Sequence, residues 1–441
     1  MHKIFQHVHS ENLKRLGGVL TLVLLALVPF HALFTVWGGT LIGKRELVAI
    51  WKEVLILLIV GLALAVSLPS VFRNGWREVL RQPAVVLVGL IILAGLLANM
   101  LNANYGMAFF VGVKTTVVPL LLFLAVQPFA HTISERRLAR VVLASACVVA
   151  ILAILQFLFV PTSFLASLGY GPSTILPFQG VHPDFPFSRS FSTLGGPNQL
   201  GTYLIIPFGV SLALAVKART RKVRYIGATL VGLFVLAAIT TFSRSALIGF
   251  GVTTALVVLL AVPKKYRLVT GLMFVAAALV AGLVMWGVLT NENSTILDRF
   301  LVRGELTPSG ILGGDEGHIA AIEKGYAAIV AYPGGLGLGA AGPASFYAAR
   351  ALLTENWYLQ IAIEVGVIGL GLMLLLLAHI VRRVRQHATH DPVRIGFVSA
   401  ALGVMVSALF LHSLADSTLA ILLFGMAGLL YASRPQKGSP L

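Results

Sequence analysis

Thr354-Glu355-Asn356-Trp357-Tyr358-Leu359-Gln360 marks the point where a long polar segment gives way to an apolar run that reaches about residue 381. A run of this length and composition predicts a helix that crosses a membrane. The segment before it, 290–355, is the longest interval of the chain without such a run. Long loops on a rigid scaffold tend to carry functional groups, so we expect the functional site near this junction.

The whole chain shares this apolar character. It has 441 residues, of which 58% are hydrophobic and only 11% are charged, and its mean hydropathy is +0.92. Repeated apolar runs of about 20 residues are typical of a polytopic membrane protein. We therefore predict one all-α membrane domain, 1–441, with about twelve transmembrane helices. The expected spans are 17–37, 47–68, 83–102, 107–130, 139–160, 197–216, 225–243, 246–263, 268–289, 356–381, 395–412 and 417–433.

The basic residues predict the orientation of these spans. The formal net charge is +17, and one side of the twelve-span arrangement holds 23 of the 33 lysines and arginines but only 4 of the 16 acidic residues. Because basic loops stay in the cytoplasm, both termini are expected there. The segments 161–196 and 290–355 then face outward, the second with short helices of its own. Anionic lipid headgroups are sufficient partners for the basic side, so nucleic-acid binding is not expected.

Cysteine and histidine provide no framework for a metal. The single Cys147 lies inside an apolar run, which excludes a disulfide framework and a cysteine-based metal site. The histidines are scattered without ligand spacing, so neither a metal nor another cofactor is expected. The apolar run from about Gly17 is interpreted as a retained first span, because no clear small-residue cleavage site follows it.

Two arginines at expected outer helix ends are candidate phosphate ligands. Arg244 lies in a Ser-Arg-Ser sequence between two spans with almost no loop. Arg189 precedes the Pro197-Asn198 start of the sixth span, whose N–H groups and positive dipole end favour anions. A guanidinium matches phosphate oxygens two at a time. The alternatives are an Arg244 that extends to lipid headgroups and a surface Arg189 beside a capped helix.

Polar residues inside expected spans are the next candidates. Lys114 lies about 8 residues into the fourth span, where it either extends to the membrane surface or faces a wet internal cavity. Asn356, Gln360 and Glu364 are four residues apart and form one polar stripe on the tenth span, with Glu355 at its mouth. A stripe at this depth lines a cavity or hydrogen-bonds to another helix.

The long outer loop contains two further features. His318 begins a predicted amphipathic helix that ends at Pro333, and it is either a structural histidine or a proton acceptor. Residues 337–342, Gly-Leu-Gly-Ala-Ala-Gly, match a dinucleotide-binding fingerprint literally, but that fingerprint requires a preceding strand within a βαβ unit. Dinucleotide binding is therefore not expected, and the glycines are expected to allow close backbone packing near the membrane or near a ligand.

Together these features resemble the O-antigen ligase and polymerase superfamily. The resemblance is carried by twelve spans, the Ser-Arg-Ser around Arg244, a long outer loop late in the chain, the Pro-Gly-Gly-Leu-Gly-Leu-Gly run 333–339, and the sequence 355–370. It covers most of the chain and is strongest over residues 189–370. The order and topology of the motifs are more specific than any one of them.

The resemblance implies an enzyme of the bacterial inner membrane that moves a glycan from an undecaprenyl-diphosphate carrier to a glycan or glycolipid acceptor, at the outer face and without a metal. Arg244 resembles the family's Ser-Arg arginine, and Asn356 resembles the asparagine of its His-Asn motif. The catalytic histidine of the ligases falls at Glu355, and His318 lies near where many members carry an arginine. These departures fit a polymerase or a divergent surface-polysaccharide enzyme better than a lipid A–core ligase.

The residues permit a mechanism in which an acceptor hydroxyl attacks the anomeric carbon of the donor and undecaprenyl diphosphate leaves. Fixed cations stabilise that leaving group, and this role is assigned to Arg244 and Arg189, with Lys114 third. A general base removes the acceptor proton; Glu355 is the first choice and His318 the second. Further substrate contacts are expected from Asn198, Asn356, Tyr358, Gln360 and Glu364.

Two other classes of protein are alternatives. A transporter of a small solute such as bicarbonate also carries buried polar stripes, and relatives of the superfamily have been proposed to act in such uptake. It requires access from both faces, whereas the long polar loops here lie only outside, and inverted repeats of broken helices would favour it. The other alternative is a structural or regulatory membrane protein. A single outward-facing cavity lined by Arg189, Arg244 and Glu355 would favour the enzyme.

Overall fold

The computed structural model describes residues 2–180, 188–289, 305–306, 312–313, 315–348, 351–386 and 391–433. These residues are almost entirely helical. The sheet among them is a single antiparallel pair of two-residue strands, β1 (Glu305–Leu306) and β2 (Leu312–Gly313). The prediction of an all-α architecture is confirmed apart from this short hairpin.

The first part of the chain forms the helices up to α11. Pro83 occupies the first turn of α7, where its missing N–H costs no hydrogen bond, and Ser134 caps α10 by accepting from the Arg137 N–H. The elements are α1 (His2–Leu27), η1 (Val28–Phe30), α2 (His31–Leu33), η2 (Phe34–Gly38), α3 (Gly39–Ile42), α4 (Arg45–Ala49), α5 (Trp51–Asn74), α6 (Trp76–Leu80), α7 (Pro83–Asn102), α8 (Met107–Gly112), η3 (Val113–Val117), α9 (Val118–Ala125), η4 (Gln127–Thr132), α10 (Glu135–Phe159) and α11 (Thr162–Ser167).

The second part begins with α12, which again starts at a proline, Pro197. Asp391 and Asp416 cap the two last long helices through their side-chain oxygens. The elements are α12 (Pro197–Lys217), α13 (Arg221–Ile239), α14 (Arg244–Ala261), η5 (Lys264–Tyr266), α15 (Arg267–Leu289), α17 (Asp315–Ala331), η6 (Gly342–Tyr347), α18 (Trp357–Gln386), α19 (Pro392–Ser407), η7 (Ser413–Ala415) and α20 (Ser417–Ala432).

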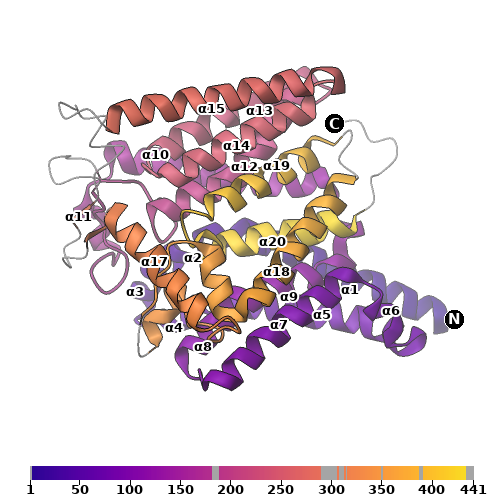
Figure 1. Ribbon diagram of the computed structural model, residues 1–441. Helices are drawn as coiled ribbons and strands as arrows, with labels where there is room; N and C mark the ends of the chain where they lie inside the picture. Colours follow the sequence, from indigo (N-terminus) through magenta and orange to yellow (C-terminus); the bar gives the residue numbers. More distant parts are fainter. Residues whose placement is uncertain are drawn as a thin grey trace.

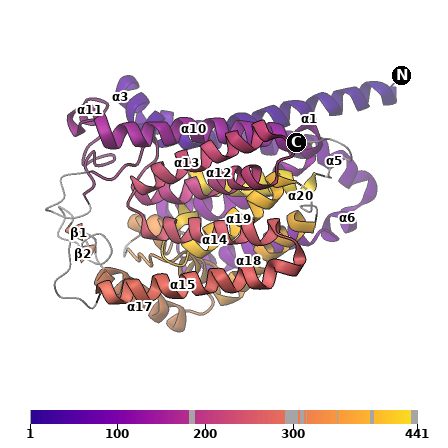
Figure 2. The ribbon, with the colours of Figure 1, turned by 90° about the horizontal axis from the view of Figure 1, so that it is seen from above.

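The long helices run along one common direction in two perpendicular views (Figures 1 and 2). The short helices α3, α4, α8 and α11 lie at one end of this bundle together with α17, and we name it the loop end (Figure 1). The start of α1 and helix α6 lie at the opposite end (Figure 1). We name this opposite end the basic end, because the arginines around α6 and at the end of α18 lie there.

Nine helical stretches of the described residues are long and apolar enough to cross a membrane. They coincide with the first eight expected spans and the tenth, so the prediction of a polytopic membrane protein is confirmed. Helix α15 overlaps the ninth expected span, while α19 and α20, at 16 residues each, are shorter than the other spans. The number twelve stays a prediction. The nine stretches are Ser10–Ile42, Arg45–Arg73, Pro83–Asn102, Met107–Ala125, Glu135–Phe159, Pro197–Lys217, Arg221–Ile239, Arg244–Ala261 and Trp357–Gln386.

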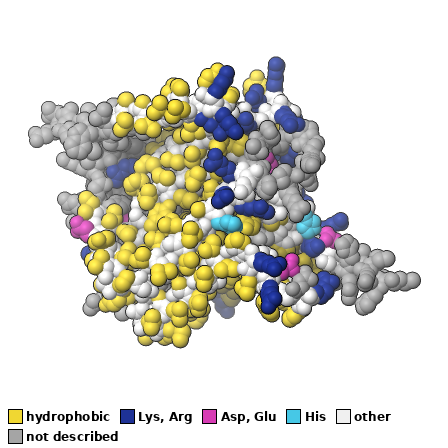
Figure 3. Space-filling model, turned by 45° about the vertical axis from the view of Figure 1, so that its right-hand side comes forward, with side chains coloured by type: hydrophobic (Ala, Val, Ile, Leu, Met, Phe, Trp, Pro, Cys, Tyr) yellow, Lys and Arg dark blue, Asp and Glu magenta, His cyan; other side chains and the backbone are white. Residues whose placement is uncertain are grey.

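The surface of the bundle is apolar in the way that a lipid environment requires. Hydrophobic side chains cover a broad band of the molecule, and lysines and arginines gather along one side of it (Figure 3). Leu57 of α5 and Leu101 of α7 are among the most exposed large side chains. The core lies instead around α12, which packs against α13, α14 and α19 and is buried along most of its length. Such an exposed apolar band favours contact with lipid acyl chains.

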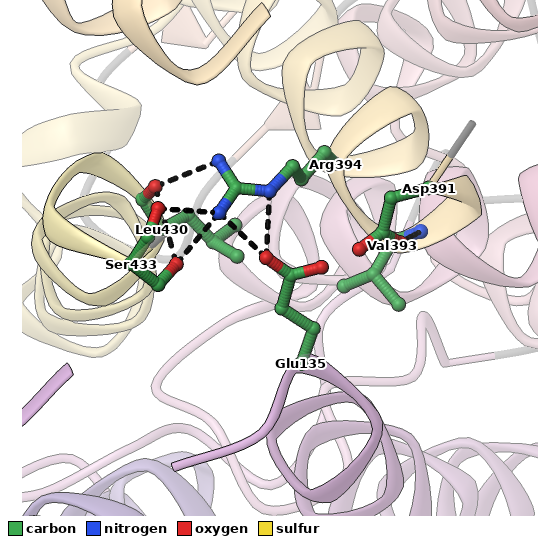
Figure 4. A network of polar contacts seen from close by, with 6 residues as sticks. All are labelled: Glu135, Asp391, Val393, Arg394, Leu430 and Ser433. Atoms are coloured by element: carbon green, nitrogen blue, oxygen red, sulfur yellow. Dashed lines mark hydrogen bonds and ion pairs between the residues drawn. The ribbon is translucent and has the colours of Figure 1, made fainter. Parts of the chain in front are cut away.

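A buried arginine joins three helices at the basic end (Figure 4). Arg394, at the start of α19, is fully buried, and its Nε donates to Oε1 of Glu135 over 2.6 Å. The same guanidinium donates to the Leu430 carbonyl at 2.9 Å and to Oγ of Ser433 at 2.7 Å. It thus satisfies carbonyl groups at the end of α20 while pairing with the first turn of α10. From the sequence, Arg394 was counted only as a topological charge.

Helix α18 is interrupted at Gly366, whose φ of 78° and ψ of 169° lie outside the helical region. In an unbroken helix the Val367 N–H would donate to the Ile363 carbonyl. Here it donates to the Pro333 carbonyl at 3.0 Å, and the Ile363 carbonyl accepts from the Leu336 N–H at 2.6 Å. The glycine run of the long loop is therefore inserted into the break and completes its hydrogen bonds.

The glycine run packs as closely as the sequence suggested. A Cβ added at Gly337 would lie 2.7 Å from Nδ2 of Asn99 on α7, and one at Gly339 would overlap the Ala108 carbonyl on α8. Both glycines have positive φ values, 102° and 83°. The G-x-G-x-x-G match thus reflects tight contact between a loop and two helices, and no βαβ unit accompanies it among the described residues.

Candidate functional site

A cavity of about 970 Å³ lies among the helix ends at the loop end of the bundle. Its walls come from α5, η3, the starts of α12 and α14, and the turn between α19 and α20. Four cationic side chains and two carboxylates line it. These are Lys52, Lys114, Arg189, Arg244, Glu355 and Asp416.

Arg189 is held in place by the two helix ends beside it. Its Nε donates to the Thr241 carbonyl at 2.8 Å, and Nη2 donates to Oδ1 of Asn198 at 2.7 Å. Thr241 lies just before α14, and Asn198 lies in the first turn of α12. Arg189 thus lies against the start of the sixth span, and Asn198 acts as its positioning partner at the cavity wall.

The loop that carries Arg189 is fixed against α10. Oε1 of Gln156 accepts from the Phe191 N–H at 3.1 Å and from the Ser192 N–H at 2.6 Å. Oγ of Ser190 donates to the Ala153 carbonyl at 2.8 Å. The half-buried Gln156 and the buried Ser190 therefore determine the path of this segment, and Arg189 reaches the cavity from a well-supported loop.

Arg244 is the first residue of α14 and lines the same cavity. The starts of α14 and α12 approach so closely that a Cβ added at Gly201 would lie 2.7 Å from Cβ of Ala246. Two helix N-termini and two arginines thus share one cavity, an arrangement that favours an anion. The two flanking serines differ: Ser245 lines the cavity, whereas Ser243 is buried beside it, with its Oγ 3.3 Å from Oγ of Ser245.

A second group of charges on the cavity wall surrounds Lys114. Nζ of Lys114 lies 2.8 Å from Oε1 of Glu53 on α5. Lys52, only 2% exposed, donates to Oγ of Ser417 at the start of α20 over 2.8 Å. Lys114 lines the cavity, with its side chain 40% exposed. It lies in the π-helical segment η3, a backbone irregularity that often accompanies functional positions.

Glu355 lines the cavity from the residue pair that precedes α18. Its φ of 46° lies in the left-handed region, which side chains other than glycine, asparagine and aspartate adopt at a cost. Residues held in such conformations cluster at functional sites. The structure therefore brings Glu355 together with Lys114, Arg189, Asn198 and Arg244, which are the candidates that the sequence placed far apart along the chain.

Asp416 is the second carboxylate of the cavity. Its Oδ1 accepts from the Leu419 N–H at 3.0 Å, which caps α20. Burial raises the pKa of Asp416, and the hydrogen bond from Leu419 and the charge of Lys52 act in the opposite direction. Asp416 is thus a cavity carboxylate whose proton is held more firmly than usual, and it was not among the candidates from the sequence.

Asn356 and Tyr358 do not line the cavity. Oδ1 of Asn356 accepts from the Tyr358 and Leu359 N–H groups at 2.9 and 3.1 Å, and Nδ2 donates to the Leu409 carbonyl at 2.8 Å. The Tyr358 hydroxyl donates to the Met405 carbonyl at 2.7 Å. Both side chains cap or join helices α18 and α19, and this placement does not support the predicted sugar contacts.

Gln360 and Glu364 are also outside the cavity, buried beneath it. Nε2 of Gln360 donates to Oε1 of Glu364 at 3.2 Å, and Oγ1 of Thr116 donates to Oε2 of Glu364 at 2.9 Å. Of the two expectations for the polar stripe, hydrogen bonding to another helix is the one that the structure shows. The stripe fastens α18 to η3, the segment that also carries Lys114.

The helix predicted around His318 is α17, which ends two residues before Pro333. The side chain of His318 lies outside the described residues, as do 290–304 and 181–187 of the two long outer segments. Ile322 of the same helix lines the cavity, so α17 reaches its rim. The described parts of the long segments contain α11 in 161–196, and β1, β2, α17 and η6 in 290–355.

The residues that sequence reasoning missed come from the second expected span and from the turn between α19 and α20. Lys52 and Glu53 stand inside an expected span, and charged residues at such depth are a signal of function that could have identified them. No protein-family model matches the chain, and no curated protein matches it. The fold and the site therefore define a class only: a polytopic α-helical membrane protein with a charged cavity at one end.

Proposed function

We propose that the cavity is the active site of a metal-independent glycosyltransferase. It would move a glycan from an undecaprenyl-diphosphate carrier to a sugar hydroxyl at the outer face of a bacterial cytoplasmic membrane, in polymerisation or ligation of a surface polysaccharide. The observation that supports this most is that Arg189, Arg244 and Lys114 line one cavity with Glu355. Cations that bind a diphosphate and a carboxylate that accepts a proton are what this transfer requires.

The cations would act on the leaving group. As the acceptor oxygen bonds to the anomeric carbon, the bond from that carbon to the phosphate oxygen breaks, and its electron pair leaves on undecaprenyl diphosphate. Arg189 and Arg244 would bind the diphosphate oxygens, since the guanidinium of Arg189 is already oriented by Asn198 and Thr241. Lys114, balanced by Glu53, and the buried Lys52 would add positive charge on the opposite wall.

The carboxylates would act on the acceptor. Glu355 is the proposed base that takes the proton from the attacking hydroxyl, with His318 as the second choice. Asp416 is less suited to this role, because its Oδ1 already accepts the hydrogen bond from the Leu419 N–H that caps α20. The carrier's isoprenoid would lie along the apolar band of the bundle, which fits a cavity at the ends of the helices (Figure 3).

The test is a glycan assay in cells that make the cognate polysaccharide. Arg244→Ala and Glu355→Gln are compared with the native protein at equal membrane levels, and Arg219→Ala, an exposed arginine of the basic end, is the matched control. Loss of long chains with accumulation of single lipid-linked units in both variants supports polymerisation. Loss of surface attachment with chain length unchanged supports ligation.

Transport is the alternative that one feature favours, because a broken helix such as α18 recurs in transporters. In this chain, however, the break is filled by the 333–337 segment and its hydrogen bonds are satisfied by protein. The polar side chains below the cavity likewise bond to one another. Unchanged glycans in both variants would remove the catalytic assignment and make transport the better interpretation.

A further inference from the structure

A second hollow lies at the basic end, at the far end of the helices from the cavity. Its volume is about 360 Å³, and it is lined by Arg81, Gln82, Pro83, His379, Arg383 and Tyr431. These residues belong to the joint between α6 and α7, the last part of α18 and the end of α20. The proposed transfer reaction uses none of them, so a role for this hollow is independent of the proposed function.

The polar groups of this hollow are held around one aromatic ring. A ring nitrogen of His379 lies 2.9 Å from the Tyr431 hydroxyl, and the Arg383 guanidinium lies 6.0 Å from the centre of the Tyr431 ring. Tyr431 is itself packed edge-on against Phe123. The ring thus anchors one cation and the imidazole at fixed positions.

The charge of the hollow is positive, because two arginines line it. No carboxylate lines it, and neither Arg81 nor Arg383 forms an ion pair with a carboxylate of the described residues. Pro83 starts α7, so the positive dipole end of that helix also faces this region. Two guanidiniums and a helix start around one hollow create a site for a phosphate group.

The surroundings of the hollow are those of a membrane boundary. Trp76 and Leu80 of α6, next to Arg81, are exposed, and so are Leu374 and Leu375 one turn before His379. A tryptophan at this level is typical of the membrane–water interface, and the exposed leucines are positioned for acyl chains. Basic pockets between helices at such a boundary bind anionic lipid headgroups.

We propose that this hollow binds the phosphodiester headgroup of an anionic phospholipid. Arg81 and Arg383 contact the phosphate oxygens, the Tyr431 hydroxyl and His379 contact the glycerol or headgroup oxygens, and the acyl chains run along α6 and α18. A lipid bound there joins α7 and α20 to α18, which packs against both of them. Free phosphate shares this chemistry, and the apolar rim is what distinguishes the lipid from it.

The experiment titrates the purified full-length protein in detergent with phosphatidylglycerol and, separately, with phosphatidylcholine, and counts bound lipid by native mass spectrometry. We expect phosphatidylglycerol to bind more tightly, and Arg81→Gln/Arg383→Gln to weaken that binding by about 10- to 30-fold. The matched control is Arg382→Gln/Arg385→Gln, which removes the same charge from exposed positions outside the hollow. It should leave the affinity within about twofold of the native value.

Several outcomes would overturn the proposal. Equal binding of the two lipids removes the headgroup site, and equal weakening in both double variants shows attraction to general positive charge only. Displacement of the lipid by an excess of inorganic phosphate assigns the hollow to a soluble anion. If the double variant does not fold, Tyr431→Phe keeps the ring and removes the hydroxyl, and it should weaken phosphatidylglycerol binding while leaving phosphatidylcholine binding unchanged.

Discussion

At the scale of single residues, Glu355 combines a place on the cavity wall with a left-handed backbone at φ 46°. We predict that Glu355→Gly is more stable than Glu355→Ala by about 1 kcal/mol. Both variants lose the carboxylate, and only glycine adopts this φ without strain. Thermal melting of the two variants in one detergent measures the difference. Glu46, an exposed residue inside helix α4, is the control position, where the order of Ala and Gly should reverse.

The raised pKa of Asp416 leads us to predict that the stability of the fold depends on pH. Because burial raises its folded-state pKa, the folded protein retains a proton that the unfolded chain has released, so stability falls as pH rises from about 4 toward the raised value. Asp416→Asn keeps the capping oxygen but does not titrate. Its melting temperature relative to the native protein should therefore increase across this interval. Asp391→Asn, the same exchange at the cap of α19, controls for loss of a charged cap, and an equal trend there would contradict the prediction.

The candidate residues show which parts of a site a sequence can reveal. Arg244 starts α14 between two serines, and Arg189 lies in the loop that leads to Pro197 at the start of α12, so both carried a signal in the sequence itself. Asn356 caps α18 in the structure, and the sequence did not distinguish this role from the predicted sugar contact, because a helix cap and a sugar ligand need the same amide group. Lys52 was missed although its charge lies inside an expected span, and its contact with the start of α20 is visible only in the fold.

At the scale of elements, the broken helix α18 depends on one glycine. A Cβ at Gly366 would lie 2.8 Å from the Gly334 carbonyl carbon and oxygen, and its φ of 78° disfavours any other residue. We predict that Gly366→Ala lowers stability by at least about 2 kcal/mol, because it combines backbone strain with overpacking. The variant should also loosen the 333–337 segment, which is measured as faster proteolysis of the long loop.

Gly371 provides the matched control on the same helix. It lies one to two turns further along α18, and a Cβ there meets nothing within 4 Å. Gly371→Ala should therefore leave the melting temperature unchanged or raise it slightly, since alanine is the better helix former. An equal loss of stability in Gly366→Ala and Gly371→Ala would mean that α18 tolerates no added methyl group at either position. The special role assigned to the break at Gly366 would then be contradicted.

Elements were predictable where periodicity and length decide them, and not where tertiary contacts do. The starts of α7 and α12 follow from Pro83 and Pro197, and the residues after each proline are apolar enough to specify a span. The break at Gly366 was not predictable, because it forms only when the distant 333–337 segment supplies its hydrogen bonds. The π-helical segment η3 around Lys114 is another irregularity of the backbone that the pattern of apolar residues does not reveal.

At the scale of the whole molecule, the two ends of the bundle differ in charge, and each has its own hollow. The orientation of the protein in the membrane decides which end is exposed to the cytoplasm. The cavity lies at the loop end with Lys44, an exposed residue between α3 and α4, while Arg219 lies in the exposed turn between α12 and α13. Since basic residues gather away from the loop end, the positive-inside rule predicts that Lys44 faces outward and Arg219 faces the cytoplasm.

Cysteine labelling tests this orientation. In a Cys147→Ala background, Lys44→Cys should react with a membrane-impermeant maleimide in intact spheroplasts, and Arg219→Cys should react only after the membrane is opened. Arg189 and Arg244 line the cavity at the same end as Lys44, so this result would mean that the cavity faces outward, where the proposed lipid-linked glycan donor would bind. If only Arg219→Cys were labelled in intact spheroplasts, the cavity would face the cytoplasm. The proposed transfer at the outer face would then be impossible.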